Sequence, residues 1–352
     1  MKQIYLLFLL LPVFVFSQIP SYYSNIDFSE TGDDLKSQLN VLITDTHTTM
    51  LEYSSNSSID TWDVLLESDL NPTNSQDVLL VYGYNDIDGI SKTDRTRDKD
   101  LACHTSGCIG LWNREHVFSK SLAEPSLDTD NPGSGTDTHN LRAADSQMNS
   151  SRSNRPYIDG EGDAGTRDNG TFYPGDEWRG DVARIIMYMY VRYPNQCEAI
   201  SVGEGSTSYS NFGDMPNIFL EWNTEDPVSS YEINRNNTIA STQGNRNPFI
   251  DNPYLATIIW NGPDAEDTWN VLSIEGSVFN NKVVLYPTIT SDYIYISNST
   301  QEYDYSVYNI LGQEVDNGIT SEKIDLSGNR KGMYIINLIS KTSQETYKVL
   351  VK

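Results

Sequence analysis

The chain has little positive charge, little histidine and few cysteines. Its 352 residues include 24 Lys and Arg against 49 Asp and Glu, a formal net charge of −25, with four His and three Cys. So few cations exclude extensive wrapping of a nucleic acid, which depends on neutralising many phosphates, but they leave room for a small basic cleft on an acidic body. The lack of a Cys-x-x-Cys pair argues against a zinc site.

Long apolar segments are also missing after the start of the chain. Residues 1–17 begin with Met-Lys, continue as a short apolar run and end in a small residue. This pattern predicts a secretory signal peptide, because the run is short for the alternative, a membrane anchor. Export permits disulfides in the mature protein, and we expect no transmembrane segment in it.

Two of the three cysteines lie close together. Cys103 and Cys108 bracket His-Thr-Ser-Gly, a turn-prone loop before a strand-like segment. We predict a disulfide between them, which would brace the entry to that strand. Cys197 would then remain free.

The spacing of apolar residues predicts the main helices. Residues 33–51, 61–70 and 180–193 have helical spacing, while residues 77–84 favour a strand. His47 falls in the first helical pattern and is interpreted as an ordinary histidine of a helix surface. These segments predict a mostly helical region with a few short strands.

The residues suited to catalysis concentrate between residues 112 and 155, where two of the four histidines fall. Glu115 offers a carboxylate oxygen and Asn149 a carbonyl oxygen, which suit Mg²⁺, with Mn²⁺ or Ca²⁺ as alternatives. His116 has an ordinary pKa near neutrality and suits general-base work on water. Adjacent strand residues point to opposite faces, so Glu115 and His116 serve one site only if the strand twists or ends there. The composition of residues 142–149 permits a helix, and the alternative to a site is a chance Glu-His pair on a surface strand.

Three motifs in this region carry a family resemblance. Asn-Arg-Glu-His-Val-Phe, Asp-Thr-His-Asn-Leu and Met-Asn-Ser-Ser-Arg-Ser-Asn occur in order, and the chain resembles the bacterial secreted endonuclease I family over most of residues 30–262. The resemblance implies a non-specific nuclease with a ββα-metal finger, in which Glu115 and Asn149 bind the metal and His116 is the general base. Where the family often has Val-Pro or Phe-Pro after its Glu-His, this chain has Val-Phe-Ser, which leaves the loop shape open.

Arginines and a second histidine surround these motifs. Arg142, Arg152 and Arg184 are the predicted substrate-binding residues, because a nuclease needs local cations for phosphates. Arg184 lies among apolar residues of a predicted helix and requires an anionic partner, either a structural carboxylate or a substrate phosphate. His139 is interpreted as structural, with a hydrogen bond that pins the second strand to the helix. Further candidates for a basic groove are Arg114, Arg155 and Arg179.

From about residue 276 the sequence changes to short strand-like runs separated by turns rich in Asn, Gly and Ser. Their regular spacing predicts a small β-sandwich. Leu-Tyr-Pro, Ile-Leu-Gly-Gln and Gly-Met-Tyr resemble motifs of the C-terminal sorting domain of the type IX secretion system of Bacteroidetes, although Tyr-Pro-Thr-Ile stands where that family usually has Tyr-Pro-Asn-Pro. The resemblance implies a sorting role, and a carbohydrate-binding module is the alternative.

Together these features predict an α+β fold: a mostly helical nuclease domain carrying a ββα-metal finger, followed by a small all-β sandwich. The expected segments are a signal peptide over residues 1–17, a catalytic domain over 18–275 and a sorting domain over 276–352. The expected activity is metal-dependent, largely non-specific endonucleolytic cleavage of DNA, with RNA left open, by a secreted monomer that also contacts the type IX secretion machinery. The alternative is a secreted, non-enzymatic surface or glycan-binding protein, which leaves the metal-site grouping unexplained.

Overall fold

The computed structural model describes residues 19–352 except 106, 270, 272–283, 298–301 and 340–343. The chain forms two compact units, Met1–Trp269 and Asn270–Lys352. The predicted signal peptide and the predicted boundary between residues 275 and 276 lie outside the described residues. Within the described part, no helix is both long and apolar enough to cross a membrane.

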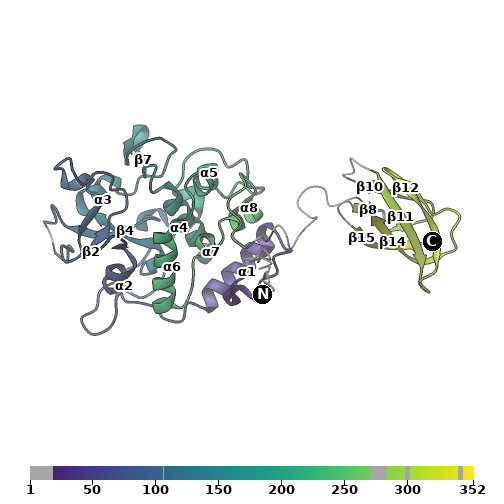
Figure 1. Ribbon diagram of the computed structural model, residues 1–352, viewed down its shortest axis with the longest axis horizontal. Helices are drawn as coiled ribbons and strands as arrows, with labels where there is room; N and C mark the ends of the chain where they lie inside the picture. The colour runs from purple at the N-terminus through teal and green to yellow at the C-terminus, as the bar shows by residue number, and fades with distance from the viewer. Residues whose placement is uncertain (1–18, 106, 270, 272–283, 298–301, 340–343) are drawn as a thin grey trace, which may run out of the picture. The chain divides into compact units, whose positions relative to one another are not determined.

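The N-terminal unit is mainly helical, with its short strands β2 and β4 beside α3 at one end (Figure 1). Its α-helices are α1 Gly32–Asp45, α2 Thr61–Ser68, α3 Ser146–Arg152, α4 Arg179–Arg192, α5 Asn217–Glu225, α6 Ser230–Gln243, α7 Pro248–Asp251 and α8 Tyr254–Trp260. Its strands are β1 Leu70–Asn71, β2 Asn74–Leu79, β3 Thr96–Asp98, β4 Trp112–His116, β5 Leu141–Asp145, β6 Gly165–Arg167 and β7 Thr171–Tyr173. The strands form three small sheets, in the orders β1-β2-β3, β4-β5 and β6-β7.

Helix α1 follows from the spacing of its apolar residues. Leu35, Leu39 and Ile43 are buried on one face of the helix, which ends earlier than the predicted helix over residues 33–51. The interpretation of His47 as a helix-surface residue was wrong. His47 is buried beyond the end of α1, because its side chain turns inward and Nδ1 lies 3.8 Å from a carboxylate oxygen of Asp137.

The helices predicted over residues 61–70 and 180–193 are confirmed as α2 and α4. A capping box between Asp60 and Asp63 begins α2, because these side chains satisfy backbone N–H groups that the first turn leaves unpaired. Apolar residues all around α4 are buried, and the helix packs against α5 and α1. Helix α4 is therefore the central helix of the unit.

The strand predicted over residues 77–84 is correct only in its first half. The chain turns after β2 at Tyr82, whose φ is 72°, and at Gly83, where a Cβ would lie 2.1 Å from the carbonyl oxygen of Asp94. This turn buries Tyr82, whose hydroxyl donates a hydrogen bond of 3.0 Å to Glu115.

The ββα arrangement predicted between residues 112 and 155 is confirmed. Strand β4 pairs antiparallel with β5, with Glu115 opposite Arg142 and His116 opposite Leu141, and α3 follows directly. Residues 142–149 are helical only in their second half. Pairing with β4 holds the first half as a strand, and the Asp145 side chain then accepts hydrogen bonds from two backbone N–H groups and begins α3.

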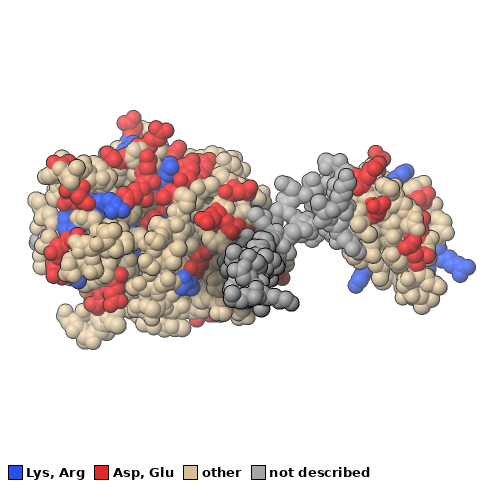
Figure 2. All heavy atoms as spheres, in the orientation of Figure 1, with Lys and Arg blue, Asp and Glu red and all other residues tan. Residues whose placement is uncertain are grey.

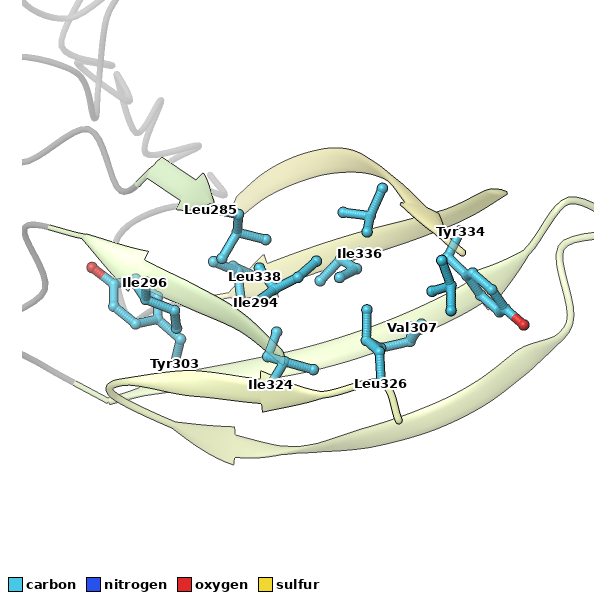
Figure 3. Close-up of a cluster of buried hydrophobic side chains, with 12 residues drawn as sticks. Leu285, Ile294, Ile296, Tyr303, Val307, Ile324, Leu326, Tyr334, Ile336 and Leu338 are labelled. Carbon is cyan, nitrogen blue, oxygen red and sulfur yellow. The ribbon is translucent and has the colours of Figure 1, made fainter. Parts of the chain in front are cut away.

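The C-terminal unit is the predicted β-sandwich. Its strands are β8 Val284–Tyr286, β9 Ile289–Thr290, β10 Tyr293–Ser297, β11 Tyr303–Asn309, β12 Glu314–Thr320, β13 Lys323–Asp325, β14 Gly332–Ile339 and β15 Gln344–Val351. They form one sheet with the order β13-β10-β8 and another with the order β12-β11-β14-β15-β9. Alternate residues such as Ile294, Ile324 and Ile336 fill the space between the sheets (Figure 3). One face of each sheet is therefore buried, and the described turns between the strands correspond to the regularly spaced Asn, Gly and Ser residues of the sequence.

Candidate active site

A cleft of about 370 Å³ opens beside the end of β4 and the exposed side of α3. It brings together Glu115, His116 and Asn149, the three residues for which the sequence predicts metal binding and general-base work. All of its lining side chains are polar or charged. They are Arg114, Glu115, His116, Ser119, Lys120, Ser121, Asn149, Ser153 and Asn154.

The end of β4 explains how two adjacent residues reach one cleft. Strand pairing stops at His116, and the next turn is held by Asn140, whose side chain accepts from the backbone N–H of Phe118 at 2.7 Å and donates to its carbonyl at 3.1 Å. The Val-Phe-Ser departure from the family pattern forms this turn, with all three residues buried. The strand therefore includes both residues and ends directly after His116, and both side chains line the same cleft.

Glu115 is a buried carboxylate whose charge is only partly compensated. It is 3 % exposed, accepts the hydroxyl of Tyr82, and lies 3.5 Å from Nε of Arg152. Burial raises the pKa of Glu115 to about 7, against the opposing effects of Arg152 and Tyr82. A divalent cation would stabilise its charged form, so this carboxylate fits the role of a metal ligand.

His116 is held in one tautomer by the backbone. Its Nε2 lies 2.8 Å from the carbonyl oxygen of Gly135, and because a carbonyl only accepts hydrogen bonds, Nε2 carries the hydrogen. Nδ1 is then the ring atom that can accept a proton. Burial lowers the pKa of His116 to about 4, which keeps the ring neutral at pH 7. The ring stacks on Tyr53, with centroids 5.7 Å apart.

Asn149 is presented to the cleft by α3. Its amide nitrogen donates to Oδ1 of Asn113 at 2.9 Å and more weakly to the carbonyl of Arg114, so its carbonyl oxygen is the atom that could bind a metal. In the described part of the chain, no three His, Cys, Asp or Glu side chains are grouped to hold a metal. Glu115 and Asn149 could supply two oxygen ligands, and such a set would suit Mg²⁺, which keeps several of its waters.

The expectation that Arg142 and Arg184 bind substrate phosphate is corrected by the structure. Both guanidinium groups are fully buried. Arg142 donates to Asp181 at 2.7 Å, and Arg184 makes two hydrogen bonds of 2.6 and 2.8 Å to the two oxygens of Glu232. Of the two partners considered for Arg184, the structural carboxylate is the one observed, because its position inside α4 faces α6 and not a cleft.

The expectation that Arg152 binds substrate phosphate is corrected for the same reason. It is fully buried, donates to the carbonyl of Val117 at 2.8 Å and to Ser119, and its Nε lies beside Glu115. A guanidinium in this position holds the turn after β4 and orients the carboxylate behind the cleft. It does not line the cleft, so it is a positioning residue and not a phosphate ligand.

Two other cations line the cleft. The sequence offers Arg114 as one of several candidates for a basic groove, and it gives no indication of Lys120. The sequence contained a signal for Arg114: it stands two residues before His116 on one strand, so both side chains face the same side. Lys120 lies in the turn after β4, where no periodic pattern applies, and its Nζ donates to Thr129 at 2.8 Å.

His139 is buried, as a structural role requires, but its hydrogen bond reaches the segment after α6 and not the helix of the ββα motif. It does not line the cleft; its Nε2 lies 3.2 Å from the carbonyl oxygen of Asn245, directly after α6, and its ring packs on Tyr188. Burial lowers the pKa of His139 to about 4. The histidine at the cleft is thus His116, while His139 ties the start of β5 to the helical part of the unit.

The predicted disulfide between Cys103 and Cys108 is present, with Cα atoms 5.6 Å apart. Cys197 is free and buried. The backbone N–H of Cys103 donates to the carbonyl of Trp112 at 2.7 Å, so the bridged loop is joined to the start of β4, as the sequence suggested.

Comparison with known proteins identifies both units. The profile described as Endonuclease I matches residues 31–254, and the one described as Secretion system C-terminal sorting domain matches residues 284–352. An extracellular ribonuclease of Bacillus subtilis (strain 168) is 38% identical over 268 residues, covering 72% of this chain and 83% of the relative. An extracellular ribonuclease of Bacillus amyloliquefaciens is 37% identical over 253 residues, covering 68% and 78%.

Proposed function

The chain belongs to the endonuclease I family, and on that premise we propose that it hydrolyses phosphodiester bonds of DNA and RNA with one divalent cation, Mg²⁺ being the first candidate. The family and the sorting domain make the protein a nuclease that is secreted or held at the cell surface. RNA is included because both relatives are named ribonucleases. The sorting domain is proposed to engage the type IX secretion machinery.

The observation that carries the proposal is the convergence of Glu115, His116 and Asn149 on one polar cleft. Glu115 and Asn149 are the proposed metal ligands. A cation bound there would polarise a phosphoryl oxygen and stabilise the leaving oxygen. Arg152 and Tyr82 hold the Glu115 carboxylate in place from the buried side.

His116 is the proposed general base. Its neutral Nδ1 accepts a proton from a water molecule, whose oxygen attacks phosphorus while the bond to the 3′ oxygen breaks. The products then carry 5′-phosphates, as the family resemblance implies. The carbonyl of Gly135 keeps the hydrogen of His116 on Nε2 and so keeps Nδ1 available.

The polar lining of the cleft supports cleavage with little base preference. It supplies two cations, hydroxyls and amides, which suit phosphate and sugar, and such contacts position a nucleic acid without reading its sequence. We therefore propose non-specific endonucleolytic cleavage, by a monomer.

The test is digestion of plasmid DNA and of a structured RNA by the purified full chain, with Mg²⁺ and with EDTA. We expect cleavage of both with Mg²⁺, none with EDTA, and products that a 5′-phosphate-dependent exonuclease degrades. Cleavage that persists in EDTA would refute the metal role. Folded protein that cuts neither substrate under any metal would favour the non-enzymatic binding alternative.

A further inference from the structure

Among the described residues, Arg114 has no carboxylate partner, unlike the three arginines that the sequence predicted to bind substrate. Arg142, Arg152 and Arg184 each lie within 4.0 Å of a carboxylate oxygen. In the described part of the chain, no Asp or Glu oxygen lies that close to Arg114. On the face of the N-terminal unit seen in Figure 2, acidic side chains are widespread and basic ones scattered. Arg114 therefore lines the cleft without a carboxylate partner that the structure describes, in a chain with a formal charge of −25.

Neutral groups hold the Arg114 side chain in position. Its Cζ lies 3.4 Å from the ring centroid of Tyr53 and 4.1 Å from that of Trp62. The guanidinium donates to Oγ1 of Thr61 at 2.8 Å, to Oγ of Ser54 at 3.1 Å and to the carbonyl of Tyr53. Aromatic faces and uncharged oxygens orient a guanidinium without cancelling its charge. We call these neighbours, with the rings of Tyr53 and Trp62 at their centre, the clamp.

The clamp is connected to the general base. The ring of Tyr53 that contacts Arg114 also stacks on the ring of His116, with an interplanar angle of 27°. Arg114 and His116 line the same cleft, and Lys120 lines it as well. A phosphate in the cleft would thus meet a fixed cation at a set position relative to the base.

We propose that Arg114, preset by the clamp of Tyr53 and Trp62, binds a backbone phosphate of the substrate in the cleft, with Lys120 as the second cation. This inference rests on the proposed nuclease function. It adds which side chains bind the phosphates of a nucleic acid in a protein whose net charge is negative. The acidic surface repels nucleic acid, so binding depends on a few cations whose charge is kept free at the cleft.

The test is the salt dependence of cleavage by Arg114→Gln, a substitution that removes the charge and retains hydrogen-bond donors for the neighbouring oxygens. With a single-stranded oligonucleotide, kcat/KM should fall about 10- to 100-fold at low salt, as for loss of a charged hydrogen bond. The slope of log(kcat/KM) against log[salt] should decrease in magnitude by about one, as for the loss of one phosphate contact. A merely structural residue would not change this slope.

The matched control is Arg192→Gln. Arg192 is also partly buried, also stacks on a tyrosine, at 4.6 Å from the ring of Tyr193, and does not line the cleft. Its substitution should leave the salt slope unchanged. Arg114→Lys retains the charge but lacks the planar group that fits the clamp, so it should keep the wild-type slope with an intermediate kcat/KM.

The outcomes separate this inference from the proposed function. An active wild type whose slope is the same after Arg114→Gln refutes the phosphate contact and leaves the nuclease proposal standing. A wild type without metal-dependent cleavage refutes both. If Arg114→Gln does not fold, Arg114→Met replaces it: a slope smaller in magnitude by about one supports the contact, and an unchanged slope refutes it. A wild-type kcat/KM in Arg114→Lys would refute the role of the clamp.

Discussion

The cleft and the buried charge network use the same residue types in opposite ways. In the cleft, Arg114 has no carboxylate within 4.0 Å in the described residues, and Glu115 is buried with incomplete compensation. In the network, every guanidinium faces a carboxylate at hydrogen-bond distance: Arg184 binds Glu232, and Arg235 binds Asp69 at 2.8 Å. The network consists of Asp69, Arg142, Asp181, Arg184, Glu232 and Arg235.

This difference separates charges that stabilise the fold from charges that are available to bind a ligand. Charges that are fully paired inside the protein have no remaining capacity for a ligand, and removing one partner leaves the other buried and unpaired. Charges left unpaired at a cleft are costly to the fold, and they are the ones available to a metal or a phosphate. Residue type therefore does not identify a phosphate-binding arginine here; a place in the cleft together with a charge that no carboxylate pairs does.

The largest expected effect is the loss of turnover in His116→Ala. The loss should be on the order of 10²- to 10⁴-fold, the range for removal of a general base, with metal binding nearly intact. Glu115→Ala should show the reverse pattern, weaker metal binding and partial recovery at high Mg²⁺, and Asn149→Ala a milder form of it. Calorimetric metal titration beside cleavage kinetics measures both. Loss of metal affinity in His116→Ala, with loss of turnover alone in His139→Ala, would mean that base and ligand are wrongly assigned.

Arg184→Met tests the network side of the comparison. It should lower the free energy of unfolding by about 3–5 kcal/mol, because Glu232 is left as an unpaired buried charge. Activity per folded molecule should be retained. The control is Arg179→Met on the same helix: Arg179 pairs with the exposed Glu225, and such a pair contributes about 0–1 kcal/mol. Denaturant unfolding gives both free energies of unfolding. An equal decrease in the two variants would contradict the claim that the buried ion pair contributes more than the exposed one.

Gly135→Ala tests how the backbone positions the base. A Cβ at Gly135 would lie 1.9 Å from the carbonyl oxygen of Asp128, so the loop must shift and move its own carbonyl away from Nε2 of His116. A displacement of about 1 Å can cost about 100-fold in rate, and we expect a loss in kcat of that order with little change in KM. Nitrogen chemical shifts of the His116 ring would report the loss of a single tautomer.

Gly133→Ala is the matched control in the same loop. A Cβ at Gly133 meets no atom within 4 Å, and its φ is not in the left-handed region. Turnover should stay near that of the wild type, as for most substitutions that touch nothing. A wild-type kcat in Gly135→Ala would show that the carbonyl is dispensable.

His139→Gln should affect stability and its pH dependence more than catalysis. Loss of a buried hydrogen bond should cost about 1–3 kcal/mol at pH 7. Burial lowers the pKa of His139 to about 4 from an ordinary value of 6.5, so its stabilisation is complete above pH 6.5 and is lost as the pH falls toward 4. Unfolding free energies of the variant should therefore fall less steeply across that window. Parallel curves for the two proteins would contradict this account.

The smallest expected effect on cleavage comes from deletion of residues 276–352. Every residue of the cleft and of the network precedes Trp269, so metal-dependent turnover should be unchanged while export past the outer membrane is lost. Cleavage assays on the purified protein and fractionation of the producing cells measure the two effects. A folded deletion variant that no longer cuts nucleic acid would place the boundary of the catalytic unit elsewhere.

Much of this protein follows from its sequence. The family motifs identified Glu115, His116 and Asn149 as one group, and the structure brings all three to one cleft. Short strand-like runs at regular spacing predicted the C-terminal sandwich, and the spacing of two cysteines predicted their bridge. These features depend on local periodicity, short loops or contiguous motifs, in which neighbours along the chain carry the information.

Tertiary structure alone decided which charges are paired. Arg142 and Arg184 looked suited to phosphate, but the carboxylates that accept their hydrogen bonds, Asp181 and Glu232, lie 39 and 48 residues away in the sequence, so no local pattern revealed them. The same holds for the carbonyl of Gly135 beside His116 and for the free charge of Arg114. The physical reason is that an ion pair or a ring clamp depends on distance in space, and only the folded chain sets the distances between segments remote in sequence.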